Sequence, residues 1–341
     1  MLKATMRYGA VRAKVMAMQG KLLTEDDFSR LCECTGLSDI VSYLRGHRGW
    51  GDIIAELPTP VTPDRLVRAV SERVWRESEK LYRFSNIDDK TFLRFSLCRG
   101  EYTLILAAMR RLISEDPGGD EAAYGFYRIK SSVDTTALAT CKNWEELLDA
   151  VSGSIFEGGL RKLTADPDTR LPNYREASVL LENTYYREVF SYISKKYAGL
   201  GKMQLEELLG READLLNIIS LLRLQRYFPG SLEKADRLLI PIHYRLSPAL
   251  TEAIIRARNE AEALELLKKS KYGQSFSDIS GSRLESVYEN AMSGFCRKLI
   301  RVAEPSVCTA QAYLALKEIE CKRLLRVIEA VKCGIDPEKA L

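Results

Sequence analysis

The feature that most constrains the fold is an apolar helical pattern that occurs three times along the chain. It covers residues 99–110, 211–223 and 317–329, and the interior of each stretch holds few polar residues. One acidic residue marks the comparable place in each stretch, and these residues stand 113 and 106 positions apart: Glu101, Asp214 and Glu320. Similarity that returns at a long, nearly constant period indicates an array of related units.

A second pattern repeats with nearly the same period. In each case a short amphipathic helix is followed by an aromatic residue, at Trp50, Phe156 and Tyr272. The spacings are 107 and 116 residues when measured on an apolar residue of each short helix, Leu44, Val151 and Leu267. The two patterns together predict three helical repeat units, at residues 1–113, 114–230 and 231–341.

Local signals predict helix almost everywhere. Thr24 with Asp27 forms a capping-box pattern, and Thr62-Pro63 and Ser247-Pro248 each place a cap before a proline at the first helical position. The best strand candidate, Leu238–His243, contains a proline, which disfavours a strand. We therefore expect an all-α protein.

Composition excludes several classes of protein. Apolar residues make up 46% of the 341 residues, but the longest apolar runs are as short as Leu104–Met109, far below the roughly 18 residues of a membrane span. The net charge of +4 is small for a nucleic-acid-binding protein, which usually shows a basic excess or stripe. Residues 1–20 are basic and lack acids, yet the apolar spacing of Val11, Val15 and Met18 favours a helix over a transit peptide.

No motif in the sequence points to catalysis. The eight Cys include no C-x-x-C pair and the two His have no metal-type neighbours, so we expect reduced thiols and no metal site. Phosphate-binding glycine loops, the Gly-x-Ser-x-Gly elbow and His-Glu-x-x-His are absent. We assign no catalytic residue, no cofactor and no small-molecule substrate.

Polar residues inside the apolar helices are the candidate site residues. They are Glu101, Asp214, Asn217, Arg223, Glu318 and Glu320. A carboxylate on an apolar helix needs a partner or its pKa shifts. It could serve catalysis or ligand binding, or it could form a buried ion pair or hydrogen bond with an arginine of a neighbouring helix, such as Arg223, Arg110 or Arg187. We favour the structural role, because the acids recur in all three stretches whereas an active site would be needed only once.

The aromatic residues Trp50, Phe156 and Tyr272 are the candidate interface residues. They could anchor partner proteins, or they could pack within their own units. Packing is the favoured alternative, because a lone aromatic residue at a helix end is commonly part of a core.

The whole chain resembles the C subunit of bacterial and archaeal V/A-type ATPases, whose counterpart in vacuolar ATPases is the d subunit. The resemblance is carried by Tyr8–Lys14 through Leu22-Leu23, by Leu208–Arg223 and by Tyr313–Ile328. The chain departs from a shared pattern where Leu104 and Arg323 stand at the position that Asn217 holds in the central stretch.

The resemblance implies an architecture and a mechanical role. Members of that family are three similar helical bundles arranged as a funnel around a pseudo-threefold axis. They cap the membrane-embedded proteolipid ring, hold the foot of the rotor shaft in a socket, and perform no chemistry. We therefore expect a non-catalytic central-stalk subunit of a V/A-type rotary ATPase, which passes torque between shaft and ring for ion transport. Its partners would be the central shaft subunits and the proteolipid ring, at the cytoplasmic face of the membrane.

Two other function classes remain open at this point. One is a soluble α-helical scaffold or adaptor that binds other proteins. The other is an enzyme that uses the carboxylates of Asp214 or Glu318, which would require a pocket with several titratable groups. Binding to nucleic acid is the least favoured, given the small net charge.

Overall fold

The structure is a computed structural model, and it describes residues 2–87, 89–114, 131–227, 235–276 and 283–341. Every regular element in these ranges is a helix, so the predicted all-α class is confirmed. The strand candidate Leu238–His243 is the end of a short helix followed by a bend.

The helices differ greatly in length. The long ones are α1 (Leu2–Gln19), α5 (Pro63–Phe84), α6 (Arg94–Ser114), α11 (Tyr174–Lys196), α12 (Gly199–Tyr227), α16 (Leu284–Val302) and α17 (Val307–Lys332). The short α-helices are α2 (Glu25–Cys32), α3 (Leu37–Gly46), α4 (Gly51–Ala55), α8 (Thr135–Thr140), α9 (Trp144–Ala150), α10 (Glu157–Leu160), α13 (Ala235–Leu238), α14 (Pro248–Ile255) and α15 (Glu260–Lys268). Short 3₁₀ helices are η1 (Lys90–Leu93), η3 (Gly273–Phe276) and η4 (Pro337–Ala340).

Contacts divide the chain into two compact units. Unit 1 comprises residues 1–142 and 296–341, and unit 2 comprises residues 143–295. The division into 1–113, 114–230 and 231–341 stays a prediction, as does the funnel with its pseudo-threefold axis.

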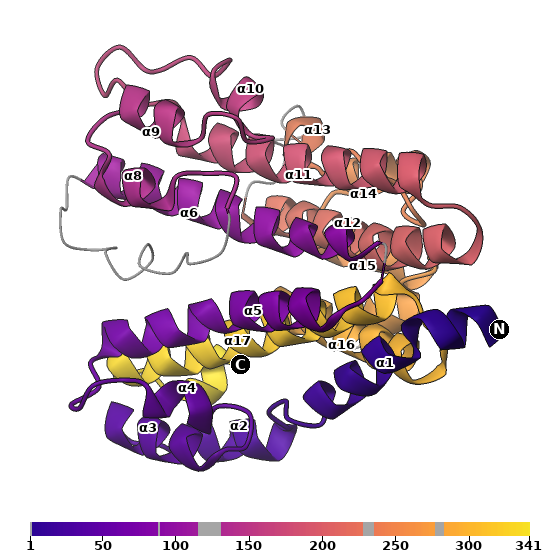
Figure 1. Ribbon diagram of the computed structural model, residues 1–341. Helices are drawn as coiled ribbons and strands as arrows, with labels where there is room; N and C mark the ends of the chain where they lie inside the picture. Colours follow the sequence, from indigo (N-terminus) through magenta and orange to yellow (C-terminus); the bar gives the residue numbers. More distant parts are fainter. Residues whose placement is uncertain (1, 88, 115–130, 228–234, 277–282) are drawn as a thin grey trace. The chain divides into compact units, whose positions relative to one another are not determined.

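Unit 1 brings the two ends of the chain into one core. The C-terminal helix α17 packs along α5 and also contacts α1, α2 and α3, while α4 packs on α5 (Figure 1). The core between them contains a large apolar cluster, which includes Leu31, Leu44, Trp50, Val70, Leu324 and Ile328. The N-terminal short helices therefore rest on the last long helix of the chain.

Helix α6 joins unit 1 through a close approach to α5. A Cβ atom added to Gly100 would lie 1.9 Å from the ring of Trp75, so only glycine fits at this position. The helix continues toward α8, which packs on it. The absence of a side chain at Gly100 thus sets how closely these two long helices can approach.

Unit 2 is organised around α12. This helix contacts α11, α13, α14 and α15, and residues on all its sides are buried between Gln204 and Gln225. A helix that is apolar around its circumference belongs in the interior of a bundle, which agrees with the central place of α12 in unit 2.

Most of the predicted helix starts agree with the structure. Thr24 and Asp27 form a reciprocal capping box, and Thr62 and Ser247 each cap a helix that has proline in its first turn. Asn143 accepts a hydrogen bond from the backbone N–H of Glu146.

None of the helices in the described ranges has both the length and the hydrophobicity needed to cross a bilayer.

Candidate functional site: buried carboxylates on the central helices

Asp214 of α12 is fully buried, and its side chain binds the backbone of a loop. Its carboxylate accepts hydrogen bonds from the N–H groups of Tyr244, Arg245 and Leu246, at 3.1, 2.6 and 2.9 Å. The Tyr272 hydroxyl donates a fourth hydrogen bond at 2.6 Å. Burial and this bond to Asp214 raise the pKa of Tyr272, so its hydroxyl stays protonated and remains a donor. Neutral donors therefore surround the charge.

Asn217, one turn further along α12, holds the same loop at an earlier point. Its side-chain amide donates to the carbonyl of Ile240 at 2.9 Å and accepts from the Ile240 N–H at 2.8 Å. Asp214 and Asn217 together fasten the chain from residue 240 to residue 246 along the helix. Helix α14 begins directly after this segment, with Ser247 as its cap.

Glu101 of α6 does the same for the loop before α8. It accepts hydrogen bonds from the backbone N–H of Ser132 at 2.7 Å and from the hydroxyls of Ser131 and Ser132 at 2.8 and 2.7 Å. Asp134, two residues later, caps α8. The acid and the amide are 31 residues apart here, against 32 for Asp214 and Leu246. The two loops are therefore built on one plan.

Glu320 of α17 holds the loop before α2, at the other end of the chain. It accepts hydrogen bonds from the backbone N–H of Leu23 at 2.8 Å and from the Trp50 indole at 3.1 Å. It also forms an ion pair with Lys317, which is only 2% exposed. The Lys317 ammonium lies 4.7 Å from the centre of the Trp50 ring, where a cation–π attraction adds to the ion pair.

The three carboxylates share one role but not the partners that we expected. We expected arginines from neighbouring helices, and for these three acids this expectation is wrong: the common partner is a backbone N–H shortly before a helix cap. Glu318 is the candidate acid that does pair with an arginine of a neighbouring helix. Arg223 instead forms an ion pair with Glu285, and both side chains are more than a third exposed. A surface pair of this kind contributes little to stability.

Glu318 is not a second copy of Glu320. It lies on another side of α17, where it pairs with Arg99 of α6 at 3.1 Å and with Lys322 at 2.7 Å. Burial raises its pKa, but these two cations outweigh burial and lower the pKa to about 2. Glu318 therefore stays ionised at neutral pH and links α17 to α6.

The three candidate interface residues lie in the interior. Trp50 and Phe156 have no exposed surface, and Tyr272 is 4% exposed. A side chain buried within its own chain offers no surface to a partner, so the packing alternative describes all three. Two of them also donate to a buried acid, which Phe156 cannot do because its ring carries no polar group.

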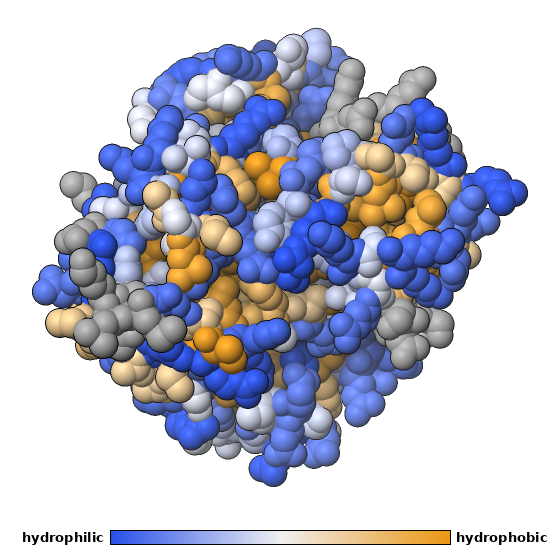
Figure 2. All heavy atoms as spheres, turned by 90° about the vertical axis from the view of Figure 1, so that its right-hand side faces the viewer, coloured by the Kyte–Doolittle hydropathy of each residue, from blue (hydrophilic) through white to orange (hydrophobic). Residues whose placement is uncertain are grey.

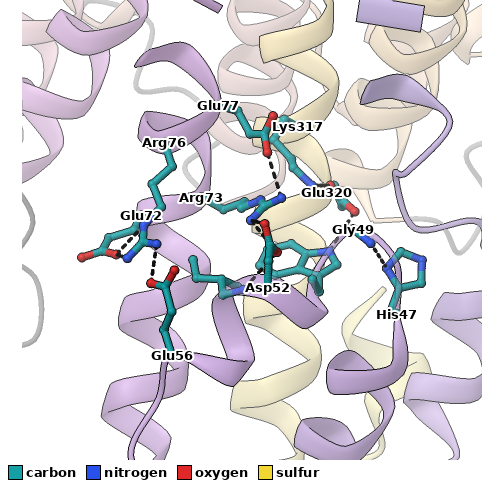
Figure 3. A network of polar contacts seen from close by, with 12 residues as sticks. His47, Gly49, Asp52, Glu56, Glu72, Arg73, Arg76, Glu77, Lys317 and Glu320 are labelled. Atoms are coloured by element: carbon teal, nitrogen blue, oxygen red, sulfur yellow. Dashed lines mark hydrogen bonds and ion pairs between the residues drawn. The ribbon is translucent and has the colours of Figure 1, made fainter. Parts of the chain in front are cut away.

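The sequence reasoning missed a polar network beside Glu320, drawn in Figure 3. Arg73 of α5 pairs with Asp52 at 3.0 Å and with Glu77 at 2.8 Å, and Glu77 accepts a hydrogen bond from Tyr313 at 3.3 Å. Arg73 and Glu77 are both buried. Their spacing of four residues on the apolar side of α5 was the available signal for a buried ion pair.

Taken together, the buried acids fix loops and join helices. In the described residues, no three His, Cys, Asp or Glu side chains gather as metal ligands would. Each of Glu101, Asp214 and Glu320 has its oxygens occupied by donors of this chain. The geometry therefore suits the bracing of a rigid helical body.

Comparison with known proteins decides the family. The family model described as "ATP synthase (C/AC39) subunit" matches residues 11–341. The chain belongs to this family. It is 26% identical to the C subunit of the A-type ATP synthase of Pyrococcus abyssi, over 97% of this chain and 88% of that protein. The corresponding protein of Thermococcus onnurineus is 25% identical, over 97% of this chain and 88% of that protein. The one of Methanosphaera stadtmanae is 22% identical, over 96% of this chain and 84% of that protein.

Proposed function

We propose that this protein is a non-catalytic central-stalk subunit of a V/A-type rotary ATPase. In this role it couples the rotor shaft to the membrane proteolipid ring at the cytoplasmic face, and so passes torque for ion transport. The observation that carries the proposal is the match of the family over nearly the whole chain, with relatives named as the C subunit of A-type ATP synthases.

The internal bracing supports a mechanical role. A part that passes torque must not yield under load, and a helical body yields first where loops meet helices. In this chain, Glu101, Asp214 and Glu320 fasten those loops from within. In unit 1 the last helix is also tied to the first loops of the chain, so the two ends are held in one core.

Exposed apolar side chains support contact with partner proteins. Met6, Phe84 and Val302 are 81%, 46% and 66% exposed, and we call them the apolar end of unit 1. Helix α1 contacts the end of α5, because Lys14 lies over the Phe84 ring. It also contacts the end of α16, because Arg12 donates a hydrogen bond to the carbonyl of Arg301, next to Val302. Figure 2 shows hydrophobic patches between hydrophilic residues on the face that it draws. Apolar surface of this kind marks contacts with proteins or membranes.

The test is purification of the tagged chain from its native membranes, with mass spectrometry of the bound proteins. We expect the ATPase head, shaft and proteolipid subunits in fixed ratio with one copy of this chain. Recovery of the chain alone, or with unrelated soluble proteins, would contradict the proposal and favour the scaffold alternative.

A pair of variants sharpens this test. Phe84→Glu with Val302→Glu places charge on the apolar end of unit 1, and we expect it to reduce recovery of the complex. The control is Ile335→Glu, at another exposed position of unit 1 (57% exposed), which should leave recovery unchanged. Both variants must keep the circular dichroism signal of the parent chain. Equal recovery with both variants would show that the apolar end of unit 1 is not an interface.

A further inference from the structure

A small cavity in unit 1 is lined mainly by cationic side chains. Its volume is about 90 Å³, and it lies between α1, α5, α17 and the segment before α4. Six lining residues are basic and two are acidic: Lys14, Lys21, Arg48, Arg73, Lys80 and Lys317 against Asp52 and Glu77. Several of these side chains meet in Figure 3, around Arg73 and Lys317.

The cavity has a built polar floor, because Arg73 and Lys317 are only 7% and 2% exposed. The two terminal nitrogens of Arg73 are engaged by Asp52 and Glu77. Its Nε is buried and has no hydrogen-bond partner in the described structure. An unpaired buried N–H of a charged group is unfavourable, so it indicates an acceptor that belongs there.

The charge around the cavity is also unbalanced. Lys317 is paired with Glu320, which lies behind it, and Arg73 is paired with Asp52 and Glu77. The remaining cations stand at the mouth, where Lys21, Arg48 and Lys80 have no ion-pair partner in the described part of the chain. Counting Glu320 with the lining residues, six cations face three carboxylates. His47 adds no positive charge at neutral pH, because burial lowers its pKa.

We propose that this cavity binds a phosphate-type oxyanion. Its oxygens would accept from the lysines at the mouth and, after a small shift of the floor, from the Arg73 Nε–H, which is buried in this structure. Planar guanidinium and ammonium groups recognise phosphate oxygens by charge-assisted hydrogen bonds. The small volume admits one tetrahedral group. The oxyanion is inorganic phosphate or the phosphomonoester headgroup of a lipid.

The test titrates inorganic phosphate into the full chain at physiological salt, by calorimetry and by NMR of the arginine Nε–H signals. We expect saturable binding of one phosphate and a shift of the Arg73 Nε–H signal. Arg73→Lys keeps the charge but removes that N–H and its signal, and it should weaken the phosphate binding that calorimetry measures. Chloride in place of phosphate should produce neither effect.

A mouth variant guards against unfolding of the Arg73 variant. Lys21→Gln with Lys80→Gln should weaken phosphate binding about tenfold, since it removes two charge-assisted contacts. Lys195→Gln with Lys196→Gln makes the same change of net charge at exposed positions of α11 and should leave binding unchanged. Equal weakening by both pairs would overturn the proposal, because the effect would then be one of overall charge.

Vesicles distinguish the two sources of the oxyanion. If vesicles that contain phosphatidic acid bind the chain and the mouth variant weakens this binding, the ligand is a lipid headgroup. If only free phosphate depends on the mouth lysines, it is a soluble oxyanion. If neither probe depends on them, and the Arg73 signal does not move, the cavity holds only water and the proposal is wrong.

Discussion

Asp214 in unit 2 and Glu320 in unit 1 each hold a loop against a helix, but only the charge of Glu320 is matched by a buried cation. Asp214 accepts from three backbone N–H groups and a hydroxyl, all neutral, and from a loop that follows it closely in sequence. Glu320 accepts from one backbone N–H and an indole, and a buried lysine matches its charge. Its loop lies 297 residues away.

This difference shows how a buried carboxylate can hold either a loop that is near in sequence or a loop from the other end of the chain. A loop near in sequence can bring several amides to one carboxylate at small entropic cost. A loop from the far end of the chain brings only one, and side chains supply the rest. Unit 2 should therefore depend most on hydrogen bonds to the backbone, and unit 1 most on its buried ion pair.

The largest effect is expected for Asp214→Ala. Removing the carboxylate leaves three N–H groups without their acceptor, one buried and two partly buried, so we expect the free energy of unfolding to fall by about 3–5 kcal/mol. Urea unfolding followed by circular dichroism measures this loss. Asp149→Ala, at a side chain that is 83% exposed, should change stability by less than about 0.5 kcal/mol. A loss below about 1 kcal/mol for Asp214→Ala would contradict this role.

Glu320→Gln should lower the free energy of unfolding by about 2–4 kcal/mol, because it leaves the Lys317 charge buried without a counter-ion. Adding Lys317→Met should restore part of this loss. Asp214→Asn should lower the free energy of unfolding by less than Glu320→Gln does, since Asp214 has no buried cation that would lose its partner. A double variant no more stable than Glu320→Gln would show that the ion pair does not distinguish the two sites.

Glycine packing extends the comparison to the helices themselves. Gly100→Ala would place a Cβ 1.9 Å from the Trp75 ring in unit 1, and Gly210→Ala would place one 2.6 Å from Tyr244, in the Asp214 loop. We expect each to reduce the thermal midpoint, with a loss of about 1–3 kcal/mol that is larger for Gly100. Gly9→Ala is the control: nothing lies within 4 Å, so alanine should stabilise that helix slightly. Equal behaviour of all three would contradict the close approach.

The smallest effects concern the aromatic donors. Trp50→Phe and Tyr272→Phe each remove one hydrogen bond to a buried acid, and each should reduce the free energy of unfolding by about 1–2 kcal/mol. Phe156 already lacks such a donor, and Glu101 takes serine hydroxyls instead of an aromatic donor. Phe156→Leu, measured in the same urea assay, is the matched change without a hydrogen bond. A phenylalanine variant as stable as the parent chain would show that the donor is dispensable.

The sequence predicted the fold class, the acids and most of the helix starts, because these depend on local pattern. The apolar circumference of α12 and the caps at Thr24 and Ser247 can be predicted from residues that are close together in the sequence. The partners of the acids could not be predicted in the same way. Every residue except proline carries a backbone N–H, so no side chain marks Leu23 or Leu246 as a donor.

Long-range contacts were the other part beyond the sequence reasoning. Nothing near Glu320 indicates that its loop lies at the opposite end of the chain, and the predicted repeat boundaries place Glu320 and that loop in different units. Arg73 and Glu77 show a helical ion-pair spacing, but so do many exposed pairs in this chain, such as Arg256 with Glu252. Burial separates the two kinds of pair, and burial depends on tertiary packing.

The most direct test of the coupling role compares ATP hydrolysis with ion uptake. The native ATPase complex, depleted of this chain and reconstituted into vesicles, would be assayed for both activities before and after the purified chain is added back. We expect hydrolysis to continue without the chain while ATP-driven ion uptake is lost, and uptake to return on addition. Ion uptake that proceeds at the same rate without this chain would contradict the proposed role as the link between shaft and ring.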